Sequence, residues 1–223
     1  MKEKKQSIDV LASHKKRQLS GGAASREKLL EAAERLILDQ GLHSLTTRNL
    51  SSLANVNVSM ISYNFDGIDG LLTELFDLNF DKFMSRQVLL LSELQLKEGE
   101  PNLKDIVKAL ILSIWHPPVY CQDGHSSTIV QEIYGHASAN VQNKATERLK
   151  NGFEPVLNLL GPLLPHLSRQ ALLWRLCSLF AATITMVPST PLWELYKSLS
   201  TPEMLEETLI VDSMVNFGVA ALA

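Results

Sequence analysis

The sequence predicts an all-α protein of about nine helices, and two patterns lead to this prediction. Apolar residues recur every three or four positions almost everywhere after residue 26, which is the spacing of one helix face. The alternation of β-branched and polar residues that marks strands is scarce. With 223 residues, 45% of them hydrophobic, the chain is long enough to bury a substantial core.

Capping residues and helix breakers place the expected helices along the chain. The first helix begins at Ser25, and Gly41 ends it. Thr46 can cap a short second helix that reaches Leu53, and Asn57 can cap a third that reaches about Tyr63. After a turn at residues 66–70, longer helices are expected at 71–96, 102–115, 126–138, 140–163, 168–187 and 202–220.

Charge is distributed unevenly along the chain. The formal net charge is −3, but residues 1–65 carry ten Lys or Arg against six Asp or Glu, whereas residues 66–223 carry eleven against eighteen. Six of the basic residues lie in the first 17 positions: Lys2, Lys4, Lys5, Lys15, Lys16 and Arg17. Such a segment is expected of a protein that meets a polyanion, although a solvated tail has the same composition.

Three regions are therefore expected. Residues 1–22 form a basic, flexible arm, residues 23–70 a small helical domain, and residues 71–223 a larger helical domain.

Several other classes of protein are disfavoured. Cys121 and Cys177 are far apart in sequence, so neither a disulfide framework nor a zinc site is indicated, and a reducing cytoplasm fits best. The N-terminus lacks the apolar run of a signal peptide. Residues 171–187 are the most apolar stretch, but they include Arg175 and are fewer than the ~20 that cross a bilayer. We expect a cytoplasmic protein without a membrane partner.

Catalysis and bound cofactors are not indicated either. The sequence has no Gly-rich phosphate loop, no GxSxG motif and no paired Glu-x-x-His motif. His116, His125 and His136 are separated by nine and eleven residues, which matches no standard zinc pattern. We therefore expect no enzyme, no cofactor and no metal site.

Residues 46–64 have the layout of a helix-turn-helix, in which a short second helix follows a tight turn and reaches base edges. Residues 46–54 form the expected first helix of the motif, residues 55–57 the turn, and the second helix follows. The residues expected to face inward are Leu50, Leu53, Ala54, Val56 and Ile61.

The segment from Arg26 to Leu72 resembles the DNA-binding domain of the TetR family of repressors. The shared features are the opening Glu27-Lys28-Leu29-Leu30-Glu31-Ala32-Ala33, then Gly41, Leu45-Thr46-Thr47-Arg48, Ala54-Asn55-Val56, Tyr63-Asn64-Phe65 and the pair Leu71-Leu72. The rest of the chain shares only the helical layout. The resemblance implies a DNA-binding regulator whose larger domain dimerises and encloses a ligand pocket.

The resemblance also implies roles for single residues. Thr46 and Thr47 would bind phosphates at a helix N-terminus, Arg48 a phosphate or a base edge, and the Tyr63 hydroxyl a phosphate. Helix capping by Thr46 and Asn57, and a solvated Arg48, are the structural alternatives. The full set expected at DNA is Thr46, Thr47, Arg48, Asn57, Val58, Ser59, Ser62, Tyr63 and Asn64.

The chain departs from the family pattern at several positions. Asn55 stands where the family usually has Gly, and Val58-Ser59 where it has Lys followed by Gly. Ser62 replaces a Tyr, Asn64 a common His, and Ile68 a phosphate-binding Lys. The lost cations predict weaker phosphate binding, which the basic arm could restore.

The larger domain is expected to dimerise through the helices near 168–187 and 202–220, which correspond to the family's dimer helices. A small, largely apolar effector is expected among the helices near 102–187. The residues expected to line its pocket, or else to be ordinary core, are Trp115, Cys121, His125, Ile129, Ile133, Tyr134, Phe153, Trp174 and Cys177.

Two functions remain open at this level. The first is a ligand-responsive homodimeric repressor that binds an operator with an inverted repeat. The alternative is a helical protein that binds a small molecule or a partner, with a degenerate helix-turn-helix. The losses at Val58 and Ile68 keep this alternative open, and the basic arm, Arg48 and Tyr63 argue against it.

Overall fold

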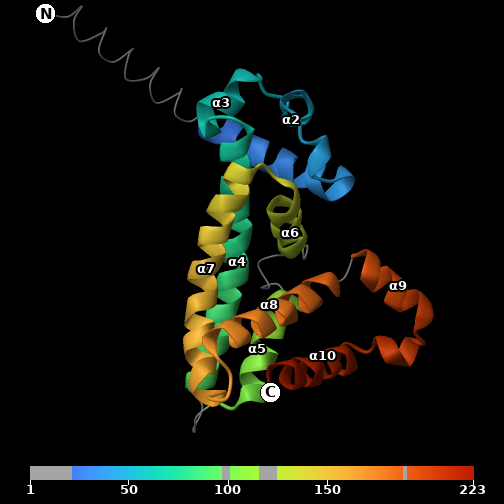
Figure 1. The fold of residues 1–223 in the computed structure, drawn as a ribbon. Helices are drawn as coiled ribbons and strands as arrows, with labels where there is room; N and C mark the ends of the chain where they lie inside the picture. Colours follow the sequence, from blue (N-terminus) through green and yellow to red (C-terminus); the bar gives the residue numbers. More distant parts are fainter. Residues whose placement is uncertain (1–21, 97–100, 116–124, 188–189) are drawn as a thin grey trace, which may run out of the picture. The chain divides into compact units, whose positions relative to one another are not determined.

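The computed structural model describes residues 22–96, 101–115, 125–187 and 190–223, except for the side chain of Glu207. Within these ranges the fold is all-α and contains ten α-helices (Figure 1). The first helix covers residues 22–40. The others are α2 (Thr47–Ala54), α3 (Ser59–Phe65), α4 (Ile68–Gln95), α5 (Leu103–Trp115), α6 (Ser126–His136), α7 (Ala139–Leu160), α8 (Arg169–Thr185), α9 (Pro191–Leu199) and α10 (Glu207–Leu222). Short 3₁₀ turns lie at η1 (Leu42–Ser44), η2 (Gly161–Leu163) and η3 (Pro202–Leu205).

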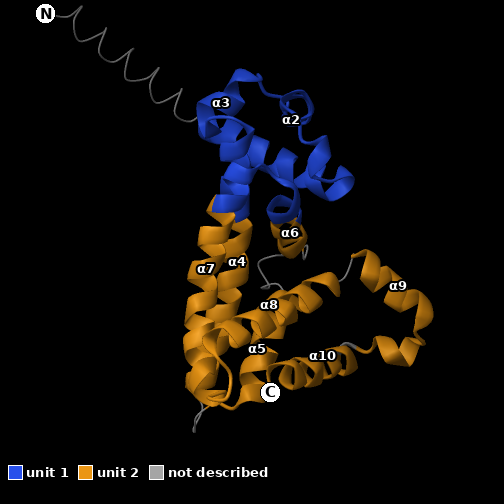
Figure 2. Ribbon diagram, in the orientation of Figure 1, with its two compact units in different colours: residues 1–76, 132–143 blue, residues 77–131, 144–223 orange. Residues whose placement is uncertain are grey.

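The chain divides into two compact units (Figure 2). Unit 1 contains residues 1–76 and 132–143, and unit 2 contains residues 77–131 and 144–223. This division differs from the sequence boundary at residue 70. The buried residues Leu71, Leu72 and Phe76 show why, because they bring the first turns of α4 into unit 1. Residues 132–143, from α6 and α7, also join unit 1 through contacts with residues far away in sequence.

Unit 1 depends on two left-handed residues at its turns. Asn55 ends α2 with φ of 52°, and Asp66 ends α3 with φ of 58°. Asn is among the few side chains that tolerate this conformation, which explains why it can stand where the family usually has Gly. Gly70 is required for space, since a Cβ atom there would lie 1.6 Å from the carbonyl oxygen of Phe65.

The buried side of α2 is narrower than the sequence predicts. Leu50 and Ala54 are buried, as expected for residues four apart on one face. Leu53 is 41% exposed, so its assignment to the core was wrong. A helix of eight residues buries little more than one row, and Leu53 lies at the edge of that row.

Unit 2 is built around an apolar core from α5, α7, α8 and α10. Glycines allow helices of this unit to pack closely. A Cβ atom on Gly218 of α10 would come within 2.7 Å of Val107 on α5. One on Gly152 of α7 would come within 2.9 Å of Phe80 on α4, and these two helices lie side by side. Arg148 strengthens that pair by bridging Asp77 and Asp81.

Helix α9 was not predicted from the sequence, in which no helix was expected between residues 187 and 202 and Pro191 can act as a helix breaker. Pro191 instead occupies the first helical position, where its missing N–H costs nothing. The hydroxyl oxygen of Thr190 accepts the N–H of Trp193 at 3.2 Å and caps the helix. Trp193 packs edge-on against Trp115, with 5.3 Å between ring centroids. None of the described helices is long and apolar enough to cross a membrane.

Candidate nucleic-acid interface

The helix-turn-helix in unit 1 consists of α2, a turn at residues 55–58, and α3. The hydroxyl oxygen of Thr46 accepts the N–H of Asn49 at 3.1 Å, which caps α2 as expected. The amide oxygen of Asn57 accepts the N–H of Ser59 at 2.9 Å and its hydroxyl at 3.0 Å. Side chains thus fix the first turn of both short helices. In α3 the N–H groups of Met60 and Ile61 are also taken, by the carbonyl oxygens of Asn57 and Val58.

Eight of the nine residues expected at DNA are exposed in unit 1: Thr46, Thr47, Arg48, Asn57, Val58, Ser59, Ser62 and Tyr63. Tyr63 is 69% and Val58 49% exposed, although large side chains of this kind gain free energy when they are buried. In contrast, Ile61 and Phe65 of the same helix are buried. Helix α3 therefore keeps an apolar side for the unit and offers hydroxyl, amide and aromatic groups to a partner.

Asn64 is placed differently from the other eight. It is half-buried, and its amide nitrogen donates to the carbonyl oxygen of Met60 at 2.8 Å. This donor is already used within α3.

The cationic character of this surface is low. Arg48 is the only Lys or Arg in α2 and α3. The folded helix-turn-helix therefore offers few cations for phosphate contacts, as the sequence predicts.

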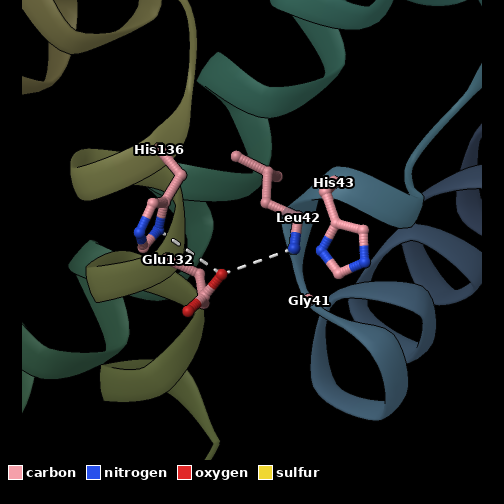
Figure 3. A pocket seen from close by; sticks show the side chains of 5 residues that line it. All are labelled: Gly41, Leu42, His43, Glu132 and His136. Carbon is pink, nitrogen blue, oxygen red and sulfur yellow. Dashed lines mark hydrogen bonds and ion pairs between the residues drawn. The ribbon is translucent and has the colours of Figure 1, made fainter.

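One contact joins α6 to η1, just before the helix-turn-helix, and sequence reasoning missed it. The carboxylate of Glu132 accepts the N–H of Leu42 at 3.3 Å and lies 3.6 Å from Nδ1 of His136 (Figure 3). Nearby, the hydroxyl of Ser138 donates to Asp69 at 2.7 Å. Glu132 and Leu42 are 90 positions apart, so no local pattern could have indicated their contact.

The hollow around Glu132 is lined by Gly41, Leu42, His43 and His136. It does not form a metal centre, because no group of three or more His, Cys, Asp or Glu side chains in the described residues could hold a metal ion.

Residues 29–75 match the family model described as bacterial regulatory proteins of the tetR family. The match spans the first helix, the helix-turn-helix and the start of α4. Unit 1 therefore contains a DNA-binding domain of the tetR type. The matched segment is the DNA-binding part of bacterial regulators of that family.

Solved structures share the TetR fold over most of the chain. A proposed TetR family transcription regulator from Shewanella sp. PV-4 has a TM-score of 0.62 at 13% identity, covering 88% of this chain and 97% of its own. The transcriptional regulator FadR from Bacillus subtilis, solved in complex with stearoyl-CoA, has a TM-score of 0.61 at 16% identity, covering 88% and 99%. A TetR family transcription regulator from Marinobacter aquaeolei VT8 gives 0.59 at 14%, covering 92% and 97%. No curated protein matches the sequence at a significant level.

The residues expected to line an effector pocket are spread over both units of the chain. Trp115 and Ile129 are buried and Phe153 is half-buried in unit 2, whereas Ile133 is buried in unit 1. His125 and Tyr134 are exposed, and Cys121 lies outside the described residues.

Trp174 and Cys177 lie on the exposed side of α8, with Trp174 76% exposed. Helix periodicity explains this placement, because Leu172, Leu176 and Leu179 already fill the buried side. These two residues face outward rather than into the interior of unit 2.

A polar group that the sequence analysis did not select lies inside unit 2. Gln87 of α4 is 3% exposed, and its amide oxygen has no hydrogen-bond partner. It lies one turn from Phe83 and one turn from Leu91, both of which pack against the core. A Gln on such an apolar row is the signal that could have identified it.

Proposed function

We propose that this TetR-family regulator is a homodimeric repressor that acts in the cytoplasm, binds an operator with an inverted repeat, and is released by a largely apolar effector. The observation that carries the proposal is the exposed polar surface of α2 and α3, with α2 capped by Thr46 and the N–H of Ser59 bonded to Asn57. A surface of hydroxyls, amides and one Arg suits base edges and phosphates better than it suits an apolar partner.

On this proposal, α3 enters the major groove with Asn57, Val58, Ser59 and Ser62 toward the bases. Val58 offers a methyl surface to thymine, and the hydroxyls and the amide pair with base edges. The N-terminus of α2, with Thr46 and Thr47, and the Tyr63 hydroxyl take the flanking phosphates. Arg48 adds the one cationic contact from these helices.

A second copy of the chain is the proposed partner of α8 and α10. These helices carry exposed apolar side chains, with Trp174 at 76% and Phe217 at 56% exposure. Leu179, Met186, Met214 and Phe217 line an apolar groove that runs between the two helices. Apolar surface of this extent is costly in water and favours a self-complementary, two-fold contact.

The proposed effector binds inside unit 2. Phe180 contacts Phe83 and Phe153, with 6.0 and 4.8 Å between ring centroids, so the interior offers an aromatic surface to an apolar molecule. The unpartnered oxygen of Gln87 favours an effector that also has a hydrogen-bond donor, since a buried acceptor without a partner costs about 1–3 kcal/mol. The stearoyl-CoA bound by the FadR relative makes acyl-CoA thioesters the first class to test.

Helices α4, α6 and α7 each have residues in both units, and α4 and α6 are the two proposed to carry the effector signal. Helix α4 passes from unit 1 to unit 2 after Phe76, and α6 passes from unit 2 to unit 1 at Glu132. Glu132 holds the N–H of Leu42 just before α2. An effector that favours a different position of α6 or α4 therefore favours a different position of the helix-turn-helix, with a coupling of about 1–3 kcal/mol.

The DNA-binding part of the proposal is tested by selecting binding sites from random duplexes. The expected product is an inverted repeat whose half-sites are about 34–36 Å apart. Sedimentation in the micromolar range is expected to show a dimer. A monomer that selects no sequence would contradict the repressor and favour the alternative, a helical binding protein with a degenerate helix-turn-helix.

The effector part is tested with stearoyl-CoA, a shorter acyl-CoA and free CoA. An effector is expected to raise the melting temperature and to lower operator affinity over the same concentration range. Gln87→Leu is expected to weaken this response, and Val88→Leu is the matched control because Val88 is exposed on the same helix. A ligand that raises the melting temperature without changing operator affinity would contradict the inducer.

A further inference from the structure

Two hydrogen bonds join Asn57, in the turn before α3, to Ser59, the first residue of that helix. The amide oxygen of Asn57 accepts the N–H of Ser59 at 2.9 Å and its hydroxyl at 3.0 Å. A backbone N–H can only donate, so the oxygen of the amide, and not its nitrogen, faces Ser59. Both lone pairs of that oxygen are therefore used within the chain.

The two side chains are left with opposite hydrogen-bonding capacities. Among the described residues nothing accepts a hydrogen bond from the amide nitrogen of Asn57, so both of its N–H donors remain for a partner. The hydroxyl proton of Ser59 is donated to Asn57, so the hydroxyl oxygen can only accept from a partner. Both residues are exposed. Toward a partner, Asn57 is thus a donor and Ser59 an acceptor.

The backbone at the start of α3 does not take part in this offer. The N–H of Ser59 is bonded to Asn57. The N–H of Met60 is bonded to the carbonyl oxygen of Asn57 at 2.9 Å, and that of Ile61 to the carbonyl oxygen of Val58 at 3.1 Å. Recognition by this end of α3 must therefore come from its side chains.

The base edges in the major groove differ in how well they suit a donor. Guanine presents two neighbouring acceptors, N7 and O6, whereas thymine presents O4, adenine presents N7 beside an amino group, and cytosine presents only an amino group. The usual contact of Asn with adenine needs the amide nitrogen and the amide oxygen together. Because the oxygen of Asn57 already accepts two hydrogen bonds, guanine suits this residue best and cytosine least.

We propose that Asn57 is a specificity-determining residue that donates to a guanine in each operator half-site, and that the oxygen of Ser59 accepts from the amino group of a neighbouring cytosine or adenine. This inference rests on the proposed function of α2 and α3. It adds which bases the start of α3 selects, and the physical reason for that choice.

The alternative is that the amide of Asn57 turns on DNA and reads adenine with both of its ends. The amide nitrogen contributes a contact to the base in either case. Turning therefore gains one hydrogen bond, from adenine N6 to the amide oxygen, and gives up two, from the N–H and the hydroxyl of Ser59. Since these bonds have similar net values, the arrangement in the structure is favoured.

The test exchanges the donor for an acceptor and keeps the bonds to Ser59. In Asn57→Asp one carboxylate oxygen can still accept from Ser59, because Asp forms the same turn as Asn, and the other oxygen replaces the amide nitrogen. The matched control is Asn55→Asp, which adds the same charge two positions away. Asn55 is exposed, and Asp also tolerates its left-handed φ of 52°. Circular dichroism and the melting temperature check the folding of both full-length variants.

Operators are selected from random duplexes with the unchanged protein and with each variant. The unchanged protein is expected to select an inverted repeat with a guanine in each half-site. Asn57→Asp is expected to replace that guanine with cytosine, because a carboxylate accepts from cytosine N4. Asn55→Asp should keep the guanine, although its added charge weakens binding to every duplex.

Four duplexes that differ only at this position are then compared by fluorescence anisotropy. The unchanged protein should bind the guanine duplex about two- to tenfold more tightly than the cytosine duplex, the value of one net hydrogen bond. Asn57→Asp should reverse the order. If Asn57→Asp binds no duplex, Asn57→Ala decides, because it removes the donor without adding charge and should bind the guanine and cytosine duplexes equally.

The role of Ser59 is tested with Ser59→Ala, which keeps the backbone N–H and removes the hydroxyl. This variant should lose the preference for cytosine or adenine at a second position and keep guanine over cytosine at the Asn57 position. A selected sequence identical to that of the unchanged protein would contradict the contact by Ser59.

Three results would overturn the assignment of Asn57 while the proposed function stands. The first is that Asn57→Asp, or Asn57→Ala where it replaces that variant, keeps the base preferences of the unchanged protein. The second is a base other than guanine at the position that the Asn57 variants alter, and adenine there would show that the amide turns. The third is the same change of base in Asn55→Asp. Failure of the unchanged protein to select any sequence would instead reject the proposed function.

Discussion

The outer surface of α2 and α3 and the outer surface of α8 and α10 are both exposed, but they differ in chemistry. The first presents hydroxyls, amides and Arg48. The second presents Leu173, Trp174, Leu209 and Phe217, each at least 40% exposed. The α2 and α3 surface suits a hydrated, charged partner. The α8 and α10 surface suits an apolar partner, so the two surfaces favour different kinds of contact.

The largest effect is expected from a charge on the α8 and α10 surface. Phe217→Glu places two carboxylates in the proposed dimer contact, and burying a charge without a partner costs about 3 kcal/mol or more. Dimerisation and operator affinity should each fall by at least about 100-fold. Sedimentation and anisotropy measure the two losses.

Val88→Glu is the matched control for this change, because Val88 is 58% exposed on α4. It should leave both quantities unchanged. If Phe217→Glu remains a dimer, α10 does not form the contact.

Arg48→Ala comes next, with an expected loss of about tenfold in operator affinity and no change in melting temperature. Arg48 is the one cation of α2 and α3, and a charged hydrogen bond to DNA contributes about 1–3 kcal/mol. Arg35→Ala is the control, since Arg35 is paired with Asp39 on the first helix. Equal affinities for the two variants would remove Arg48 from the interface.

Tyr63→Phe should reduce operator affinity about two- to tenfold, the value of one net hydrogen bond. The ring keeps its position beside Gly22, and only the hydroxyl is lost. Tyr134→Phe is the control, because Tyr134 is 42% exposed on α6. Binding isotherms that coincide for Tyr63→Phe and the unchanged protein would contradict the phosphate contact.

The smallest change in stability is expected from removing a threonine cap, and each unit has one. Thr46→Ala and Thr190→Ala should each lower the free energy of unfolding by about 1 kcal/mol, because each removes a hydroxyl that accepts a helix N–H. Only Thr46→Ala should also weaken DNA binding, and Thr46→Ser should restore it. Denaturant unfolding with anisotropy tests the pair, and a loss of DNA binding in Thr190→Ala would show that the two effects cannot be separated.

The sequence by itself determined the features that are encoded within a few residues. Helix periodicity, the caps at Thr46 and Asn57, and the turn at Asn55 each depend on neighbours within one or two turns, so the all-α class and the helix-turn-helix could be predicted. A proline can either end a helix or occupy its first position. Pro191 occupies the first position of α9, and this helix was therefore not predicted.

Tertiary structure decided the contacts and the burial that depend on residues far apart in sequence. It brought Glu132 to Leu42 across 90 positions, turned Trp174 and Cys177 outward, and buried Gln87 on an apolar row. It also placed Gly22, the first described residue, beside the ring of Tyr63. Periodicity specifies that a helix has a buried side, but which neighbour covers that side, and which polar group is enclosed, depends on how distant segments pack.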